Sequence, residues 1–328
     1  MEIVWIDPDR AQECLVAFLR AKLVESRKRG IALGLSGGID SAVTAGLCLK
    51  VTGDPSKVFC LHMPDRHTDP RHTKAARMLA RTWGMRLREI DITETALRQG
   101  AYALTLLRLR PFPSWLGRPV LWGLLRLASC VLKEPAYIFS LRKGSSPVSE
   151  RGHVQRIVAF FERSFNIRHI LRRKMLEECA AEEEMLPVGC ANRSEFFVGW
   201  FVKDGIDDLP TEPLLALYKT EVLMLARHLG IPLSVLRSRP SPDMLRGLAD
   251  EVCIGFSYEK IDLVAYMVEH GLEEDVLHKR GLTLKEIEGI KMLHRLSAWK
   301  RENLHEFPRI VRTFPRGPRF LDKDMPAY

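Results

Sequence analysis

A glycine-rich stretch directly after a short apolar run constrains this chain more than any other feature. The apolar run is Ile31–Leu35, and the stretch that follows is Ser36-Gly37-Gly38-Ile39-Asp40-Ser41. A short apolar run that ends at a turn signal predicts a buried strand, and two adjacent glycines allow backbone N–H groups to surround an anion. A helix beginning at Ser41 would add its partial positive charge at the same point. The sequence therefore predicts a phosphate-binding loop between a strand and a helix.

The segments around this loop alternate between helical and extended periodicity. We expect helices over 9–29, 41–50 and 69–83, and strands over 31–35, 58–63 and 86–90. This alternation is typical of an α/β fold with a doubly wound, Rossmann-like parallel sheet that helices flank. A single α/β domain over residues 1–328 fits the length and the 46% hydrophobic content.

Two regions extend beyond that core. Residues from about 100 to 164 are unusually apolar and basic, and we interpret them as a helical insertion. Prolines and arginines interrupt its apolar stretches before any reaches the roughly 20 residues that a transmembrane helix needs. A lid or subunit contact is therefore expected, and a helix on a membrane surface is the less favoured alternative. Residues 271–328 are expected to form a C-terminal helix, capped by Thr283 and Glu286, and a basic tail.

Composition narrows the class of protein further. The formal net charge of +9 is compatible with a polyanionic partner, but the basic residues are spread along the chain without an RNA-binding signature. A basic surface around a nucleotide pocket is the favoured interpretation. The seven cysteines form no C-x-x-C pair, so neither a zinc site nor a disulfide framework is predicted. With no apolar signal segment near the start, we expect a cytoplasmic protein.

The glycine loop lacks the lysine of the Walker A pattern G-x-x-x-x-G-K-[ST], so transfer of a terminal phosphate is disfavoured. Leu33–Val43 instead resembles the pyrophosphate loop of the N-type ATP pyrophosphatases, and more narrowly that of the ammonia-dependent NAD synthetase family. Further segments resemble this family in order along the chain: Phe165-Asn-Ile-Arg168, Val188-Gly-Cys-Ala-Asn-Arg-Ser-Glu195, Leu217-Tyr-Lys-Thr220, Ala226–Pro232, Arg239-Pro-Ser241, Asp250-Glu251, Ser257-Tyr-Glu259 and, more weakly, Trp299-Lys-Arg301.

The resemblance implies a two-step reaction that uses ATP and Mg²⁺. A substrate carboxylate attacks the α-phosphorus of ATP, pyrophosphate leaves, and ammonia then attacks the acyl-adenylate. Asp40 and Glu195 would be the Mg²⁺ ligands, since hard carboxylate oxygens suit that ion. Lys219 would meet the pyrophosphate or the adenylate, and a surface lysine is the alternative interpretation. The residues expected to bind ATP are Ser36, Gly37, Gly38, Asp40, Ser41, Arg172, Asn192 and Ser241.

Departures from the family pattern concentrate where the family recognises its acid substrate. Three charged side chains that the family pattern expects are replaced by Ile170, Ile206 and Pro210. Two neighbouring acids are the candidates to take over a catalytic role, Asp207 and Asp208. Positions that match the acid-binding residues of the family are Asn166, Lys203 and Lys300. Adenylation is therefore predicted more firmly than the identity of the acid.

Three functions remain open at this point. The first is a ligase that amidates nicotinic acid adenine dinucleotide, with ammonia either free or delivered by a separate glutaminase. The second is a related enzyme that adenylates another carboxylate or a tRNA base, for which salt-sensitive binding to nucleic acid is expected. The third is an ATP-binding regulatory protein without catalysis. The resemblance also implies a two-fold homodimer.

Overall fold

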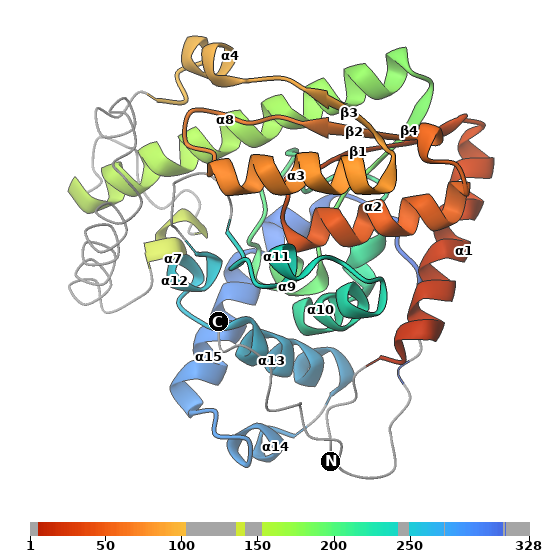
Figure 1. Ribbon diagram of the computed structural model, residues 1–328. Coiled ribbons are helices and arrows are strands. Elements are labelled where there is room, and N and C mark those ends of the chain that lie inside the picture. The colour runs from red at the N-terminus through yellow and green to blue at the C-terminus, as the bar shows by residue number, and fades with distance from the viewer. Residues whose placement is uncertain are drawn as a thin grey trace.

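The chain folds around a four-stranded parallel sheet. The computed structural model describes residues 6–102, 136–141, 153–241, 249–271, 273–310 and 312. The strands are β1 (Gly30–Gly34), β2 (Val58–His62), β3 (Arg86–Glu89) and β4 (Met185–Val188), in the spatial order β3-β2-β1-β4. Helices lie on both faces of the sheet (Figure 1), so the predicted α/β fold class is confirmed.

The helices follow the predicted order closely. The described helices and 3₁₀ turns are α1 (Pro8–Ser26), α2 (Ile39–Thr52), η1 (Pro55–Lys57), α3 (Pro70–Trp83), α4 (Thr93–Arg98), α7 (Ala136–Leu141), α8 (His153–Glu182), α9 (Arg193–Val198), η3 (Pro213–Ala216), α10 (Lys219–His228), α11 (Leu233–Leu236), α12 (Asp250–Ile254), α13 (Tyr258–His270), α14 (Asp275–His278), α15 (Leu284–Leu296) and η4 (Ala298–Glu302). The first helix ends three residues earlier than the 9–29 expected, because Arg27 adopts a left-handed conformation with φ of 54°.

The two faces of the sheet are covered by different helices, because successive side chains of a strand point to opposite faces. Ile31 belongs to an apolar cluster that includes Leu15 of α1 and Leu47 of α2. Ala32 points to the other face, where it clusters with Leu176 of α8. Figure 1 shows α8 above the sheet and α2 below it. This two-sided core makes the sheet a rigid platform for the loops at its edge.

The strand order reverses between β1 and β4. From β1 the chain proceeds to β2 and β3 on one side, and it returns through α8 to place β4 on the other side of β1. The loops that leave the carboxyl ends of β1 and β4 are therefore neighbours. In open α/β sheets the crevice outside such a switch point is where ligands bind. The glycine loop 36–41 follows β1, and the segment 189–195 follows β4.

A layer of helices packs beyond this edge of the sheet. Phe197 of α9, Ile261 of α13 and Ile290 of α15 share one apolar cluster. Thr283 and Glu286 form the predicted capping box at the start of α15. Figure 1 shows α13 and α15 below the sheet, with α9 and α10 between them and the strands. This layer supports the residues that follow β4.

Of the expected insertion, the structure describes α7 and the first residues of α8. Residues 103–135 and 142–152 lie outside the described residues, so the role of the insertion as a lid or subunit contact stays a prediction. In the described part of the chain, every helix is too short or too polar to cross a bilayer.

Candidate active site

The glycine loop is held closed by its own two serines. The Ser36 hydroxyl accepts a hydrogen bond from the Gly38 N–H at 3.2 Å, and it lies 3.0 Å from the Ser41 hydroxyl. Ser41 in turn donates to the Gly38 carbonyl at 3.0 Å. Gly37 has φ of +87°, and a Cβ there would lie 2.2 Å from the carbonyl oxygen of His72. The loop therefore requires glycine at this position, and it leads directly into the N-terminus of α2.

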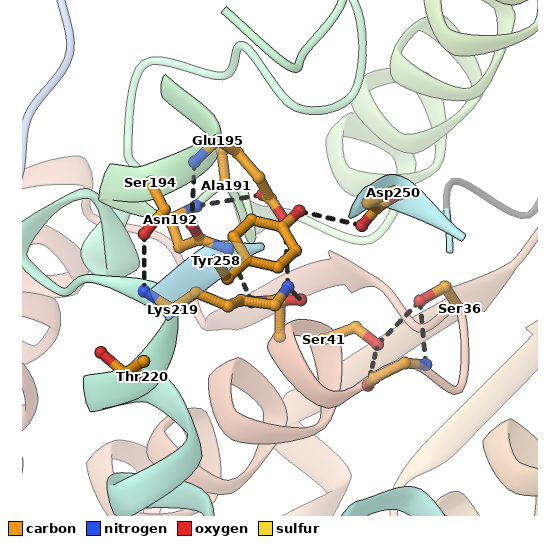
Figure 2. A network of polar contacts seen from close by, with 12 residues as sticks. Ser36, Ser41, Ala191, Asn192, Ser194, Glu195, Lys219, Thr220, Asp250 and Tyr258 are labelled. Atoms are coloured by element: carbon orange, nitrogen blue, oxygen red, sulfur yellow. Dashed lines mark hydrogen bonds and ion pairs between the residues drawn. The ribbon is translucent and has the colours of Figure 1, made fainter. Parts of the chain in front are cut away.

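Three helix N-termini bring a lysine and two carboxylates together beside this loop (Figure 2). Lys219 is the first residue of α10, and its Nζ lies 2.6 Å from Asp40 Oδ2 and 3.0 Å from Glu195 Oε1. Asn192 caps α9 and donates its amide to Asp40 Oδ1 at 2.9 Å. Lys219 is only 1% exposed, so it is not a surface lysine. The structure thus joins four residues, Asp40, Asn192, Glu195 and Lys219, from three separate segments of the sequence pattern.

The charges in this group are strongly coupled. Burial raises the pKa of the Glu195 carboxyl; the Lys219 ammonium group lowers it, and the Asp40 charge raises it again. Burial alone would lower the pKa of Lys219, but the carboxylates of Asp40 and Glu195 outweigh that effect and raise it. Lys219 is therefore a permanent cation, held where an anionic phosphate chain would pass from the glycine loop.

Tyr258 and Asp250 extend the polar network, although no role was predicted for them from the sequence. The Tyr258 hydroxyl donates to Asp250 Oδ2 at 2.9 Å and lies 3.3 Å from Glu195 Oε1. The Lys219 Nζ lies 5.0 Å from the centroid of the Tyr258 ring, a cation–π distance. Burial raises the pKa of Asp250 to about 6. Both residues fall in segments that resemble the family, and this resemblance was the sequence signal that could have identified them.

Asp40 and Glu195 have the donor chemistry that Mg²⁺ requires. Both carboxylates form an ion pair with the same group, the Lys219 ammonium. Within the described residues, no group of three or more His, Cys, Asp or Glu side chains could hold a metal by itself. Mg²⁺ is commonly bound by one or two carboxylates together with water and substrate phosphates. The two carboxylates beside the phosphate loop fit that kind of site.

The remaining residues predicted to bind ATP lie at separate positions. Arg172 of α8 donates its Nε to the Met63 carbonyl at 3.0 Å, just beyond the end of β2. A buried ion pair between Asp65 and Arg168, at 2.8 Å, lies beside it. Ser241 is the last described residue before the segment 242–248, which lies outside the described residues. The ATP-binding roles of Arg172 and Ser241 stay predictions.

Two of the three residues predicted for the acid substrate, Lys203 and Lys300, contact the C-terminal segment or backbone carbonyls. Lys203 Nζ lies 2.5 Å from Glu302 Oε2 and donates to a backbone carbonyl at 3.2 Å. Lys300 donates to the Gly199 carbonyl at 2.8 Å, at the end of α9. Asn166 is half-buried on α8. Lys203 and Lys300 lie in one neighbourhood, because Lys203 donates to the carbonyl of Trp299, which directly precedes Lys300. The acid-binding roles of all three residues stay predictions.

The two acids proposed to take over a catalytic role, Asp207 and Asp208, have different surroundings. Both oxygens of Asp208 are occupied: the Asp204 N–H donates at 2.7 Å, Asn303 donates at 2.6 Å, and His305 Nε2 lies 2.7 Å away. Asp207 lies 2.6 Å from His169 Nδ1, and its side chain is 33% exposed. Burial opposes ionisation of Asp207, but His169, together with the charges of Arg172 and Lys300, outweighs burial and lowers the pKa of Asp207. Asp207 is thus the more accessible acid, and the catalytic roles of both stay predictions.

The three positions that depart from the family pattern, Ile170, Ile206 and Pro210, also differ in their surroundings. Ile206 packs on the sheet edge, since a Cβ built at Gly34 would lie 2.8 Å from its Cδ1. Ile170 is 45% exposed on α8, and Pro210 is exposed. An apolar side chain therefore lies against β1 where the family pattern expects a carboxylate.

Comparison with known proteins agrees with this arrangement. The family model described as NAD synthase matches residues 11–103 and 151–304, and its interruption falls inside the expected insertion. The NH₃-dependent NAD⁺ synthetase of Thermotoga neapolitana is 33% identical over 260 residues, which cover 79% of this chain and 84% of the relative. That of Thermotoga maritima is 30% identical over 295 residues, covering 89% and 97%.

Solved structures show the same fold. An NMN synthetase from Francisella tularensis superposes with a TM-score of 0.64 at 22% identity, covering 96% of this chain and 99% of the other. An NH₃-dependent NAD synthetase from Campylobacter jejuni gives 0.61 at 21% identity, covering 94% and 100%. The fold, the joined ATP-side residues and the extent of the sequence match agree: the chain belongs to the NAD synthase family, whose members are ATP-dependent carbon–nitrogen ligases.

Proposed function

We propose that this chain converts nicotinic acid adenine dinucleotide to NAD, with ATP cleaved to AMP and pyrophosphate and ammonia supplying the nitrogen. One observation carries the proposal. The Lys219 ammonium group links the carboxylates of Asp40 and Glu195 beside the 36–41 loop, at the switch point of the sheet. Adenylation demands little acid–base chemistry but strong neutralisation of phosphate charge and precise alignment. The site is rich in groups of that kind.

In the first step the substrate carboxylate attacks the α-phosphorus of ATP and pyrophosphate leaves. The N–H groups of the glycine loop and the N-terminus of α2 bind phosphate oxygens, and the Lys219 ammonium group stabilises charge on the leaving pyrophosphate. Bound Mg²⁺ would neutralise the phosphates, and Asp40 and Glu195 would hold it. In the second step ammonia attacks the acyl carbon, so an amide forms and AMP leaves.

The identity of the acid is proposed on the relatives' names rather than on the geometry of the acid side. Asp207, paired with His169, and Lys203 lie on the loop where the acid is expected. The apolar contact of Ile206 with β1 is the main departure on that side. The acid form of NMN and other carboxylates are therefore alternative substrates. A homodimer, the ammonia source and a cytoplasmic location also stay predictions.

The test is the formation of NAD and the release of pyrophosphate by the purified protein. The reaction contains ATP, Mg²⁺, ammonium and nicotinic acid adenine dinucleotide, and parallel reactions contain the acid form of NMN or no acid. We expect NAD to form at a rate that Asp40→Ala reduces by about 10²-fold or more. If pyrophosphate is released with the acid form of NMN but not with nicotinic acid adenine dinucleotide, the mononucleotide is the substrate. If the protein binds ATP but releases no pyrophosphate in the presence of either acid, another carboxylate, a tRNA base or a non-catalytic role would remain.

A further inference from the structure

A buried carboxylate, Asp262, lies one layer behind the Lys219 ammonium group. Asp262 projects from α13 and is 2% exposed. Its Oδ1 accepts a hydrogen bond from the Ser194 hydroxyl, and its Oδ2 accepts from the N–H (2.9 Å) and the hydroxyl (2.6 Å) of Thr220. Burying a carboxylate is costly unless hydrogen bonds satisfy it, and here three donors do so.

These donors belong to the first turns of the two helices that carry Glu195 and Lys219. Ser194 precedes Glu195 in α9, and Thr220 follows Lys219 in α10. The Ser194 hydroxyl also accepts a hydrogen bond from the Lys219 N–H at 2.7 Å, as Figure 2 shows. N–H groups in the first turn of a helix have no acceptor within that helix. Those of Lys219 and Thr220 are therefore satisfied by α9 and α13, with Asp262 at the junction.

The same face of α13 contacts the site a second time. Tyr258 lies one turn before Asp262 on α13, so the two side chains lie on one face of that helix. The Tyr258 hydroxyl lies 3.3 Å from Glu195 Oε1. One helix thus reaches α9 through Ser194 and Glu195, and it reaches α10 through Thr220.

We infer that Asp262 is a positioning residue, which fixes the Lys219 ammonium group against Asp40 and Glu195 by holding the first turns of α9 and α10 together. Lys219 has four rotatable side-chain bonds, so its backbone must be fixed if Nζ is to stay 2.6 Å and 3.0 Å from the two carboxylates. Asp262 acts through Ser194 and Thr220 without reaching the reacting atoms. Its effect on turnover rests on the proposed function; its effect on ATP binding does not.

The test compares Asp262→Ala with a variant that damages the same layer without touching a polar group. Ile290→Ala serves as this control, because Ile290 is fully buried in the apolar cluster that α13 shares with α15. For both variants we would measure the melting temperature, the dissociation constant for ATP with Mg²⁺, kcat, and KM for the acid. Asp262→Asn is the conservative variant, since its amide keeps one acceptor oxygen.

We expect Asp262→Ala to weaken ATP binding and lower kcat by about tenfold each, with KM for the acid unchanged, because displaced charges cost rate without altering the acid side. Asp262→Asn should recover part of that loss. Ile290→Ala should lower the melting temperature comparably and leave both ATP binding and kcat within about twofold. Equal losses of ATP binding in the two alanine variants would overturn the inference and make Asp262 a purely structural residue.

A double variant shows whether Asp262 acts on ATP binding through Lys219 or independently of it. If Asp262 acts through Lys219, Asp262→Ala should weaken ATP binding by less than about twofold in a Lys219→Met background. Losses that multiply would overturn the inference. Should Asp262→Ala fail to fold, Ser194→Ala takes its place, since it removes the same link to the Lys219 N–H. Failure of the wild type to make NAD would sink the proposed function, whereas the ATP-binding comparison would still decide this inference.

Discussion

The residues predicted to bind ATP, here the ATP side, and those predicted to bind the acid, here the acid side, are arranged in opposite ways. On the ATP side, Asp40, Glu195 and Lys219 come from three helix N-termini, and the Lys219 Nζ lies 2.6 Å from the Asp40 carboxylate and 3.0 Å from the Glu195 carboxylate. On the acid side, Lys203 and Asp208 pair instead with residues of the C-terminal segment, such as Glu302 and His305. On the ATP side the charged residues thus converge on one point. On the acid side they tie a loop to the C-terminal segment.

The difference indicates where the chemistry is fixed and where specificity can vary. A phosphate chain needs a rigid set of N–H groups and cations, and the ATP side supplies these from the ends of helices. An acid substrate varies in size and polarity, and a loop tied down at a few points can accommodate such variation. Variants on the ATP side should therefore lower turnover with any acid, whereas variants on the acid side should change preference among acids.

The largest effect is expected for Lys219→Met, which removes the cation and keeps most of the side-chain volume. Loss of one charged group that stabilises the transition state lowers kcat by about 10²–10³-fold. We would follow pyrophosphate release with each acid in turn. The loss should be the same for all acids, and a loss confined to one acid would break the comparison between the two sides.

Gly37→Ala should lower ATP affinity by about 10²-fold, because the backbone of the loop must move to relieve the contact with the His72 carbonyl. Gly53→Ala is the matched control. Gly53 also has a positive φ, of +62°, but a Cβ there meets no atom within 4 Å. The control should lose about 1 kcal/mol of stability and keep its ATP affinity. Calorimetric titration with ATP and Mg²⁺ distinguishes the two variants, and equal affinities would show that the loop does not bind phosphate.

On the acid side, Lys203→Met should raise KM for the acid by about tenfold and leave KM for ATP unchanged, since one charge contact with substrate is worth roughly 1.4 kcal/mol. Glu302→Gln is the control, because it breaks the ion pair with Lys203 and leaves the lysine in place. Steady-state kinetics with each substrate varied separately would check this. A rise in KM for ATP would mean that the two sides share Lys203.

The last effect concerns stability rather than activity, and it is a change in the pH dependence of the free energy of unfolding. Burial and, to a smaller extent, the nearby Glu221 charge raise the pKa of Asp262 to about 7, although the hydrogen bonds from Ser194 and Thr220 oppose the rise. The folded state then holds a proton that the unfolded state releases near pH 4, so stability falls as pH rises from about 5 to 7. Each pH unit corresponds to about 1.4 kcal/mol for this one group. Urea unfolding of wild type and Asp262→Asn at several pH values should show a shallower slope for the variant, and parallel slopes would contradict the assignment.

Local patterns predicted the fold well. Strand and helix periodicity gave β1, β2, β3 and the helices between them, and the capping box at Thr283 was visible because both its residues lie within one turn. The helix predicted over 9–29 was too long, because the left-handed conformation of Arg27 leaves no periodic signal.

The site could be predicted only in part. The glycine loop is contiguous, and Asn192, Glu195 and Lys219 were found through family segments. Asp262 was missed because it lies on a helix whose pattern is that of core packing, and its partner Ser194 is 68 residues away. The contacts of Asp208 with Asn303 and His305 likewise span 95 and 97 residues. Such pairs depend on tertiary folding, which a linear pattern does not encode.

One carboxyl group connects the two sides. Glu212 is fully buried and accepts hydrogen bonds from the Ala191 N–H at 2.9 Å and the Leu209 N–H at 3.1 Å, while Gly189 leaves room for it, since a Cβ there would lie 1.8 Å from its Oε1. Leu209 is therefore a fixed end of the acid-side loop. Residues 203–207, which precede it, form a segment that could be exchanged as a unit. Grafting residues 203–207 from a relative that uses a different acid should transfer substrate preference without changing the nucleotide-binding residues. This junction is therefore a natural boundary for engineering new amide ligases.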